Sequence, residues 1–117
     1  GGGVEAKVED SLSVRRGNTV WREWQAANDG FFQLQARTQK PAEGEVQLRL
    51  LDSNRKVLVV VTSLGGAGQP GNLRRLLWTV PVRAGDRVEL AVRPGDGIDS
   101  FALTSVKAQF IYFGVPE

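Results

Sequence analysis

Alternation of apolar and polar residues is the strongest pattern in this chain. It is clearest over residues 32–36, where Phe, Leu and Ala are separated by glutamines, and it recurs over residues 46–50, 88–92 and 4–8. A period of two places one set of side chains on a buried face and the other set in water. Each of these four segments is therefore predicted to be a half-buried β-strand.

Two further runs are apolar at almost every position. Residues 57–61 are Val-Leu-Val-Val-Val, and residues 76–82 are Leu-Leu-Trp-Thr-Val-Pro-Val. β-branched and aromatic residues favour strands, and a run without alternation suits a strand that is covered on both sides. We expect both runs to be central strands or strands between two sheets, and Trp78 to belong to the core.

Turn-forming residues separate the predicted strands. Clusters of Asn, Asp, Ser, Gly and Pro stand at residues 28–30, 52–54, 84–86 and 94–97, where they supply positive φ angles or turns closed by side chains. The Gly-Asp pair of the third cluster is expected to reverse the chain and to cap the turn through the Asp carboxylate. This turn would deliver the strand that follows it to the core in register.

The spacing of the turns predicts the fold class. Over residues 45–64, the longest stretch without Gly or Pro, apolar residues at i, i+2 and i+4 fit better than a helical period. About eight short strands with a turn roughly every 8 to 12 residues predict an all-β fold, an antiparallel two-sheet sandwich, of which the jelly roll is the commonest eight-stranded form. An immunoglobulin sandwich is the alternative, although the chain has no Cys pair.

Length and composition fit one globular domain. The chain has 117 residues, of which 41% are hydrophobic and 24% are charged, and single domains have about 100 to 150 residues. We place the domain at residues 4–117 and interpret residues 1–3, all Gly, as a flexible lead-in or a cloning scar. Because the sequence contains no Met, we expect a domain excised from a longer polypeptide.

The charges are nearly balanced, with 15 Lys and Arg against 13 Asp and Glu, and the arginines are spread along the chain among acidic residues. Nucleic-acid-binding proteins concentrate Lys and Arg on one face. No apolar run reaches the roughly 18 residues of a membrane span, and no signal-peptide pattern opens the chain. We therefore expect neither nucleic acid as a partner nor membrane insertion.

Residue types that most enzyme mechanisms need are missing. The sequence has no Cys and no His, which excludes disulfides, thiol nucleophiles, the usual zinc sites and imidazole catalysis. Ser105 and Lys107 lie two positions apart without an oxyanion loop, and Asp96 and Asp99 are too few for a calcium site. We expect no catalytic residues, no metal and no cofactor, and we predict that the protein is not an enzyme.

The Gly-rich segment 65–72 is a candidate binding loop. A phosphate-binding loop would be followed by Lys and Ser or Thr at the start of a helix, whereas Leu-Arg-Arg follows here. A long mobile loop between the two apolar strands fits the composition better, and such loops often carry binding sites. Gln69, Asn72 and Arg74 are its candidate ligand-binding residues.

Trp21 and Trp24 are the candidate aromatic ligand-binding residues. They lie three positions apart on a predicted strand, so alternation directs them to opposite faces unless a bulge intervenes. An exposed Trp supports sugar binding by stacking against C–H groups, or supports a protein contact, because its large flat ring has a polar edge. The alternative is packing at the edge of the core.

Three motifs resemble small β-sandwich domains found in bacteriophage tail and fibre proteins. Residues 24–32 resemble their opening, an aromatic residue followed by Ala-Pro-x-Asp-Gly and a hydrophobic strand, although Ala27 stands in place of the Pro. Residues 80–88 resemble their Pro-Val-Lys-Lys-Gly-Asp-x-Val turn, and residues 108–114 resemble their closing Phe-Ile-Tyr-x-x-Gly strand. The broader similarity is to jelly rolls of the complement and tumour necrosis factor type.

The resemblance implies a virion or extracellular domain that assembles a phage appendage or attaches it to a host-surface glycan or another virion protein. It also implies a homotrimer, which would cover sheet edges that otherwise invite aggregation. Phe110 and Tyr112 share one parity of the last strand, and Ile111 and Phe113 share the other. One pair should face away from the core, and these four residues are the candidate subunit contacts.

Two other functions fit the same sequence. One is a carbohydrate-binding module of a bacterial enzyme or surface protein, and the other is a purely structural interaction domain. A stable trimer would favour the virion role, whereas glycan binding that depends on Trp21 or Trp24 would favour recognition of a sugar.

Overall fold

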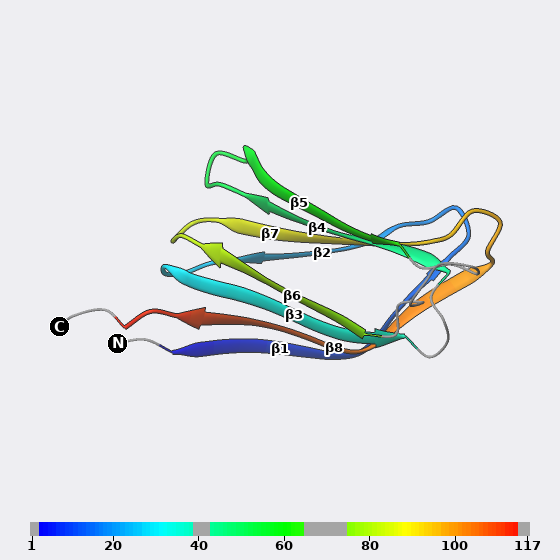
Figure 1. The fold of residues 1–117 in the computed structure, drawn as a ribbon, viewed down its shortest axis with the longest axis horizontal. Coiled ribbons are helices and arrows are strands. Elements are labelled where there is room, and N and C mark those ends of the chain that lie inside the picture. Colours follow the sequence, from blue (N-terminus) through cyan, green and yellow to red (C-terminus); the bar gives the residue numbers. More distant parts are fainter. Residues whose placement is uncertain (1–2, 39–42, 65–74, 115–117) are drawn as a thin grey trace.

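The computed structural model describes residues 3–38, 43–64 and 75–114, and these residues form eight β-strands in two layers (Figure 1). The strands are β1 (Val4–Arg15), β2 (Val20–Gln25), β3 (Gly30–Thr38), β4 (Gly44–Leu51), β5 (Val57–Leu64), β6 (Arg75–Val82), β7 (Arg87–Pro94) and β8 (Ser100–Tyr112). The first sheet has the order β1-β8-β3-β6, and the second sheet has the order β2-β7-β4-β5.

The pairing of the strands identifies a jelly roll. β1 pairs with β8, β2 with β7, β3 with β6 and β4 with β5, all antiparallel, so the chain resembles one long hairpin that has been rolled into two sheets. The β3–β8 and β4–β7 pairs complete the two sheets. The predicted antiparallel two-sheet sandwich of jelly-roll type is confirmed, and the strand order differs from that of the immunoglobulin alternative.

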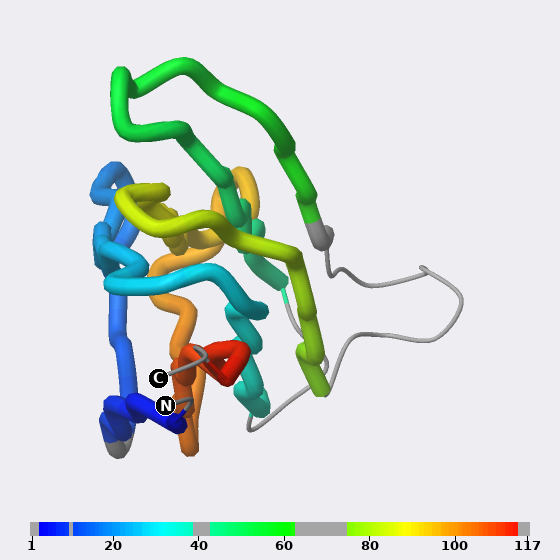
Figure 2. Tube along the Cα trace, turned by 90° about the vertical axis from the view of Figure 1, so that its left-hand side faces the viewer, coloured from blue at the N-terminus to red at the C-terminus, as the bar shows by residue number. Residues whose placement is uncertain are grey.

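The first and last strands lie side by side at one edge of the first sheet (Figure 2). Their register runs from Val4 opposite Ile111 to Arg15 opposite Ser100. Beyond the paired strands, the backbone N–H of Tyr112 donates to the carbonyl of Gly3 at 2.8 Å.

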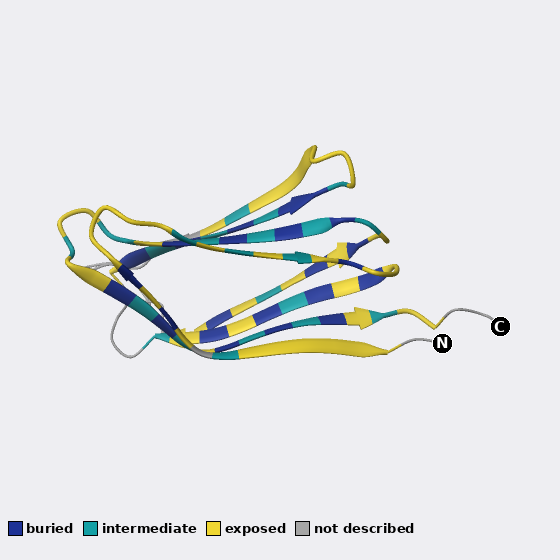
Figure 3. Cartoon of the chain, turned by 180° about the vertical axis from the view of Figure 1, so that it is seen from behind, coloured by how far each residue is buried: buried dark blue, intermediate teal, exposed yellow. Residues whose placement is uncertain are grey.

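The core lies between the sheets, where side chains of alternating strand positions meet. Burial alternates along β3, β4 and β7 (Figure 3), which confirms the period predicted for residues 32–36, 46–50 and 88–92. The largest fully buried side chains are Phe32, Leu34, Leu48, Leu90, Leu103, Val46, Val88, Val92 and Val106. These strands are therefore half-buried, with their second set of side chains available to the surface.

The N-terminal half of β1 does not bury the face that its alternation predicts. Val4 and Val8 are 67% and 69% exposed, because they stand opposite Ile111 and Lys107, which are positions on the outer face of the first sheet. The strand prediction for residues 4–8 is correct, but the apolar set faces solvent. β1 reaches the core further along the strand, at Leu12 and Val14.

The prediction that the two apolar runs are central strands is wrong. β5 and β6 are the last strands of their sheets, and residues 57–60 are 40–52% exposed. A β-branched run fits the pleated surface of a strand whether or not both faces are covered. Trp78 of β6 packs against the core but stays partly exposed, because its strand is at an edge.

A polar contact links β1 and β2, which are edge strands of different sheets. Arg22 donates to both carboxylate oxygens of Glu9, at 2.9 and 3.3 Å. The hydrogen bond that Arg22 donates to the Glu9 carboxylate raises the pKa of Arg22 above its ordinary value. At the end of the sandwich where β2 and β8 finish, the hydroxyl of Tyr112 accepts from the backbone N–H of Ala27 at 3.2 Å.

The Gly-Asp turn forms as predicted. Gly85 has a φ of 89°, and the buried carboxylate of Asp86 accepts from the backbone N–H of Arg83 at 2.8 Å. A second carboxylate, Asp29 of the β2–β3 turn, accepts from the backbone N–H of Ala84 at 2.9 Å. The two turns are thereby tied together, and β7 enters the core in register.

We predict that Asp86→Ala lowers the free energy of unfolding by roughly 1 to 3 kcal/mol, because it leaves the Arg83 N–H without its acceptor. Asp96→Ala, at an exposed position in another turn, should change it by less than about 0.5 kcal/mol. Urea unfolding followed by fluorescence measures both values. Equal stability of Asp86→Ala and the parent would contradict the role assigned to this turn.

Candidate functional site

The outer face of the second sheet carries one uncharged row of side chains that crosses all four strands. The register places Trp21 of β2 opposite Ala91 of β7, Ala91 opposite Gln47 of β4, and Gln47 opposite Thr62 of β5. Residues that are opposite each other in an antiparallel sheet share a face. The indole of Trp21 therefore stands at one end of a row of small and polar side chains.

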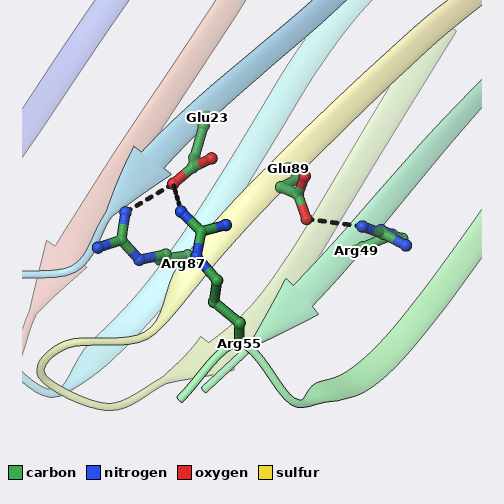
Figure 4. Close-up of polar contacts among 5 residues, drawn as sticks. All are labelled: Glu23, Arg49, Arg55, Arg87 and Glu89. Atoms are coloured by element: carbon green, nitrogen blue, oxygen red, sulfur yellow. Dashed lines mark hydrogen bonds and ion pairs between the residues drawn. The ribbon is translucent and has the colours of Figure 1, made fainter. Parts of the chain in front are cut away.

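Charged rows lie on both sides of this uncharged row. On one side, Arg93 forms an ion pair with Glu45. On the other side, Glu23 and Glu89 stand opposite each other on β2 and β7, which by itself would be repulsive. Arginines offset this repulsion (Figure 4), because Arg49 pairs with Glu89 at 2.8 Å and Arg87 pairs with Glu23 at 2.7 Å.

Arg55 adds a longer contact to the same cluster, with 4.0 Å between its Nη2 and Oε1 of Glu23 (Figure 4). The acidic groups on this face are thus each matched by an arginine. The face presents paired charges around a neutral strip rather than a field of one sign.

A shallow groove of about 150 Å³ opens over the uncharged row. Its lining residues are Thr19, Trp21, Glu45, Gln47, Ala91 and Arg93. Ala91 has the smallest side chain of the row, so it leaves space between the indole on one side and the Gln47 amide on the other. Gln47 donates through Nε2 to Oγ1 of Thr62 at 3.3 Å.

Trp21 and Trp24 lie on opposite faces of β2, as alternation predicts. Trp21 is 53% exposed on the outer face. Trp24 is half-buried and packs against Phe32, with ring centroids 5.3 Å apart, at the edge of the core. The structure therefore brings Trp21 into the groove and separates Trp24 from it.

Gln69, Asn72 and Arg74 lie outside the described residues, so their part in binding stays a prediction. In the last strand, Phe110 is buried and Tyr112 stacks on it with centroids 5.6 Å apart. Ile111 and Phe113 are 38% and 52% exposed on the outer side. They form the pair that faces away from the core, and their role as subunit contacts stays a prediction.

Sequence reasoning did not identify Gln47, Ala91 and Arg93 as site residues. Alternation marks Gln47 and Ala91 as outward positions of their strands. Their meeting with Trp21 depends on the strand order β2-β7-β4, which no local pattern contains. The sequence feature that could have indicated the groove is Ala91, a small residue at an outward position between the outward residues Glu89 and Arg93.

A larger and more open hollow of about 720 Å³ lies at the end of the sandwich that carries the β4–β5 turn. Its apolar wall includes Leu58, Val59, Pro81 and Phe113. Three Asp residues also line it, and each carboxylate there accepts from backbone N–H groups of a turn. The acidic groups of this hollow therefore serve to close turns.

Within the described ranges, no group of three or more acidic residues is arranged to hold a metal ion. Asp99, one of the two acids considered for calcium, forms an ion pair with Arg16 at 2.9 Å. The same part of the chain contains no helix long and apolar enough to cross a membrane.

No family model matches this sequence, and no curated protein matches it. Solved structures with a similar arrangement include the C-terminal CBM6 of a marine laminarinase from Zobellia galactanivorans, with 15% identity, a TM-score of 0.47, and coverage of 92% of this chain and 99% of that chain. A family 35 carbohydrate-binding module from Clostridium thermocellum has 11% identity, a TM-score of 0.42, and coverage of 91% and 92%.

An Arthrobacter globiformis T6 isomalto-dextranase complexed with panose has 13% identity and a TM-score of 0.46, and the match covers 81% of this chain but only 17% of the enzyme. None of these three structures is a phage tail or fibre protein, so they give the sequence resemblance to that family no support. With all three TM-scores below 0.5, we transfer no residue role or ligand from these proteins.

The two tryptophans should differ in their contribution to stability. Trp24→Ala removes a ring packed against the core and is expected to lower the free energy of unfolding by about 2 to 4 kcal/mol. Trp21→Ala should cost less than about 1 kcal/mol, because its ring is largely in solvent. Chemical denaturation of the two variants and the parent measures the difference, and a larger loss for Trp21→Ala would contradict the assignment of faces.

Proposed function

We propose that this chain is a non-catalytic carbohydrate-binding module that holds a neutral sugar unit in the Trp21 groove. The observation that carries the proposal is the exposed indole of Trp21 beside the small Ala91, within a groove otherwise lined by hydrogen-bonding side chains. A pyranose ring has an apolar face of C–H groups and a rim of hydroxyls. An indole packs against such a face, and side-chain amides and charged groups bind the rim.

Different groove residues would contact the apolar face of the sugar ring and its hydroxyl groups. Trp21 would stack on the face of the sugar ring, above Ala91. Gln47, Glu45 and Arg93 line the same groove and would exchange hydrogen bonds with hydroxyls, which both donate and accept. Because buried polar groups must be matched, a correctly placed hydroxyl is favoured over an apolar group at each of these positions.

The paired charges favour a neutral ligand. Arg93 is engaged by Glu45, and the arginines of the next charged row are engaged by Glu23 and Glu89. An anionic sugar would have to displace one of these carboxylates from its arginine. The proposed ligand is therefore a neutral glycan, and the proposed setting is extracellular.

The sheet holds the groove residues in position before a ligand binds. Trp21, Ala91 and Gln47 stand on three adjacent strands that are joined by backbone hydrogen bonds. Binding to such a surface requires little ordering of the backbone, which limits the entropic cost.

Affinity electrophoresis in gels containing soluble neutral polysaccharides tests this proposal. We expect at least one of starch, dextran, xylan, laminarin and hydroxyethylcellulose to retard the parent protein, and Trp21→Ala to abolish the retardation. Leu77→Ala is the matched control, because it removes a large apolar side chain that is 63% exposed on the other sheet. Absence of retardation by every polysaccharide, or equal retardation of Trp21→Ala, would overturn the proposal.

A virion appendage is the second candidate, and one observation favours it. An apolar row crosses the outer face of the first sheet, where Val4 stands opposite Ile111, Ile111 opposite Phe31, and Phe31 opposite Pro81. Phe113 adds an edge-to-face contact with Phe31, with centroids 5.4 Å apart. An exposed apolar strip of this kind is the surface that a subunit contact would cover.

Native mass spectrometry tests the second candidate. If it is correct, the chain is a trimer at micromolar concentration, and Ile111→Lys dissociates it because a charge then stands in the subunit contact. Lys107→Glu, on the same face of the same strand but outside the apolar row, is the control and should leave the trimer intact. A monomeric parent would contradict the virion role and leave the Trp21 proposal unaffected.

A further inference from the structure

A second hollow adjoins the Trp21 groove at the end of the second sheet. It has a volume of about 320 Å³ and is lined by residues 16–19 of the β1–β2 turn and residues 93–97, which end β7 and begin the β7–β8 turn. Thr19 and Arg93 line both this hollow and the groove. The two spaces are therefore adjacent, with Thr19 and Arg93 at their common border.

The walls of the hollow are held in place by contacts between the two turns and by a contact to the residue before β4. The backbone N–H of Arg16 donates to the carbonyl of Asp99 at 2.8 Å, and the Arg16 side chain pairs with the Asp99 carboxylate at 2.9 Å. The N–H of Gly95 donates to the carbonyl of Glu43 at 2.7 Å. A Cβ at Gly95 would lie 2.9 Å from that carbonyl oxygen, so the approach requires Gly.

Two other glycines keep the hollow open. Gly17 and Gly97 have φ angles of 81° and 76°, and a Cβ at either position would meet no atom within 4 Å. These turns therefore adopt a left-handed backbone without filling the space beside it with a side chain. The result is room for a ligand between two fixed turns.

The hollow offers hydrogen-bonding groups that the protein itself does not use. Asn18 and Asp96 line it, and both are exposed. Within the described ranges, their side chains form no hydrogen bond and no ion pair. A side-chain amide both donates and accepts, and a carboxylate accepts from two neighbouring hydroxyls at once. This combination suits the hydroxyl pairs of a sugar, whereas the Asp96 carboxylate disfavours an anionic one.

We propose that this hollow binds the second unit of a neutral oligosaccharide whose first unit stacks on Trp21. The inference rests on the proposed function and extends it, because it makes the preferred ligand a chain of at least two sugar units. Such a chain runs from the sheet surface over Arg93 and into the space between Asn18 and Asp96.

Nuclear magnetic resonance titration separates the two sites. The probes are glucose, xylose and the di- and trisaccharides of the malto, isomalto, cello, laminari and xylo series, added to ¹⁵N-labelled protein. A monosaccharide should shift the Trp21 indole N–H and the Ala91 amide. The disaccharide of the same series should also shift the amides of Gly17, Asn18 and Gly97.

Affinity should follow the same pattern. The disaccharide is expected to bind at least tenfold more tightly than the monosaccharide. Asn18→Ala and Asp96→Ala should each reduce disaccharide affinity by roughly 3- to 10-fold, the range for one lost hydrogen bond, and leave monosaccharide affinity unchanged. Asn54→Ala, in the β4–β5 turn at the far end of the sandwich, is the control and should bind like the parent.

The outcomes distinguish this inference from the proposed function. If no sugar shifts the Trp21 indole, the proposed function fails and the second site fails with it. If the indole shifts but affinity is independent of chain length, or Asn18→Ala and Asp96→Ala bind the disaccharide like the parent, the second site is overturned while the Trp21 site stands.

Discussion

The register of β7 against β2 and β4 is the constraint on which the rest of the structure depends. Because Val88, Leu90 and Val92 are fully buried, the intervening residues of β7 must face outward. A slip of one position would bury Glu89 and Ala91 and expose the core. The same register places Ala91 between Trp21 and Gln47, so the packing of the core and the shape of the groove have one cause.

On the outer face of the second sheet, ion pairs with arginine offset the repulsion between neighbouring carboxylates. Glu23 and Glu89 would repel each other across the β2–β7 pair, yet each carboxylate contacts an arginine from a neighbouring strand or turn. Arg49 and Glu89 are only partly exposed, so water screens this pair less than a fully exposed one. The ion pairs flank the neutral strip on both sides, and every carboxylate of the two charged rows contacts an arginine.

The fold could be predicted from the sequence further than the site could. Local alternation predicted β3, β4 and β7 and the opposite faces of Trp21 and Trp24, and the Gly-Asp pair predicted the turn at Gly85 and Asp86. It could not show that β5 is an edge strand, because a run of valines has the same composition in a central or an edge position. The groove needs three strands in one order, and that order is a property of the whole jelly roll rather than of any segment.

A crystal structure of the chain with a neutral oligosaccharide bound is the most direct measurement of the central claim. The account predicts a sugar ring parallel to the indole of Trp21 and above Ala91, with hydroxyls within hydrogen-bonding distance of Gln47 and Arg93. A sugar bound instead in the apolar hollow beside Phe113, or on the outer face of the first sheet, would contradict it.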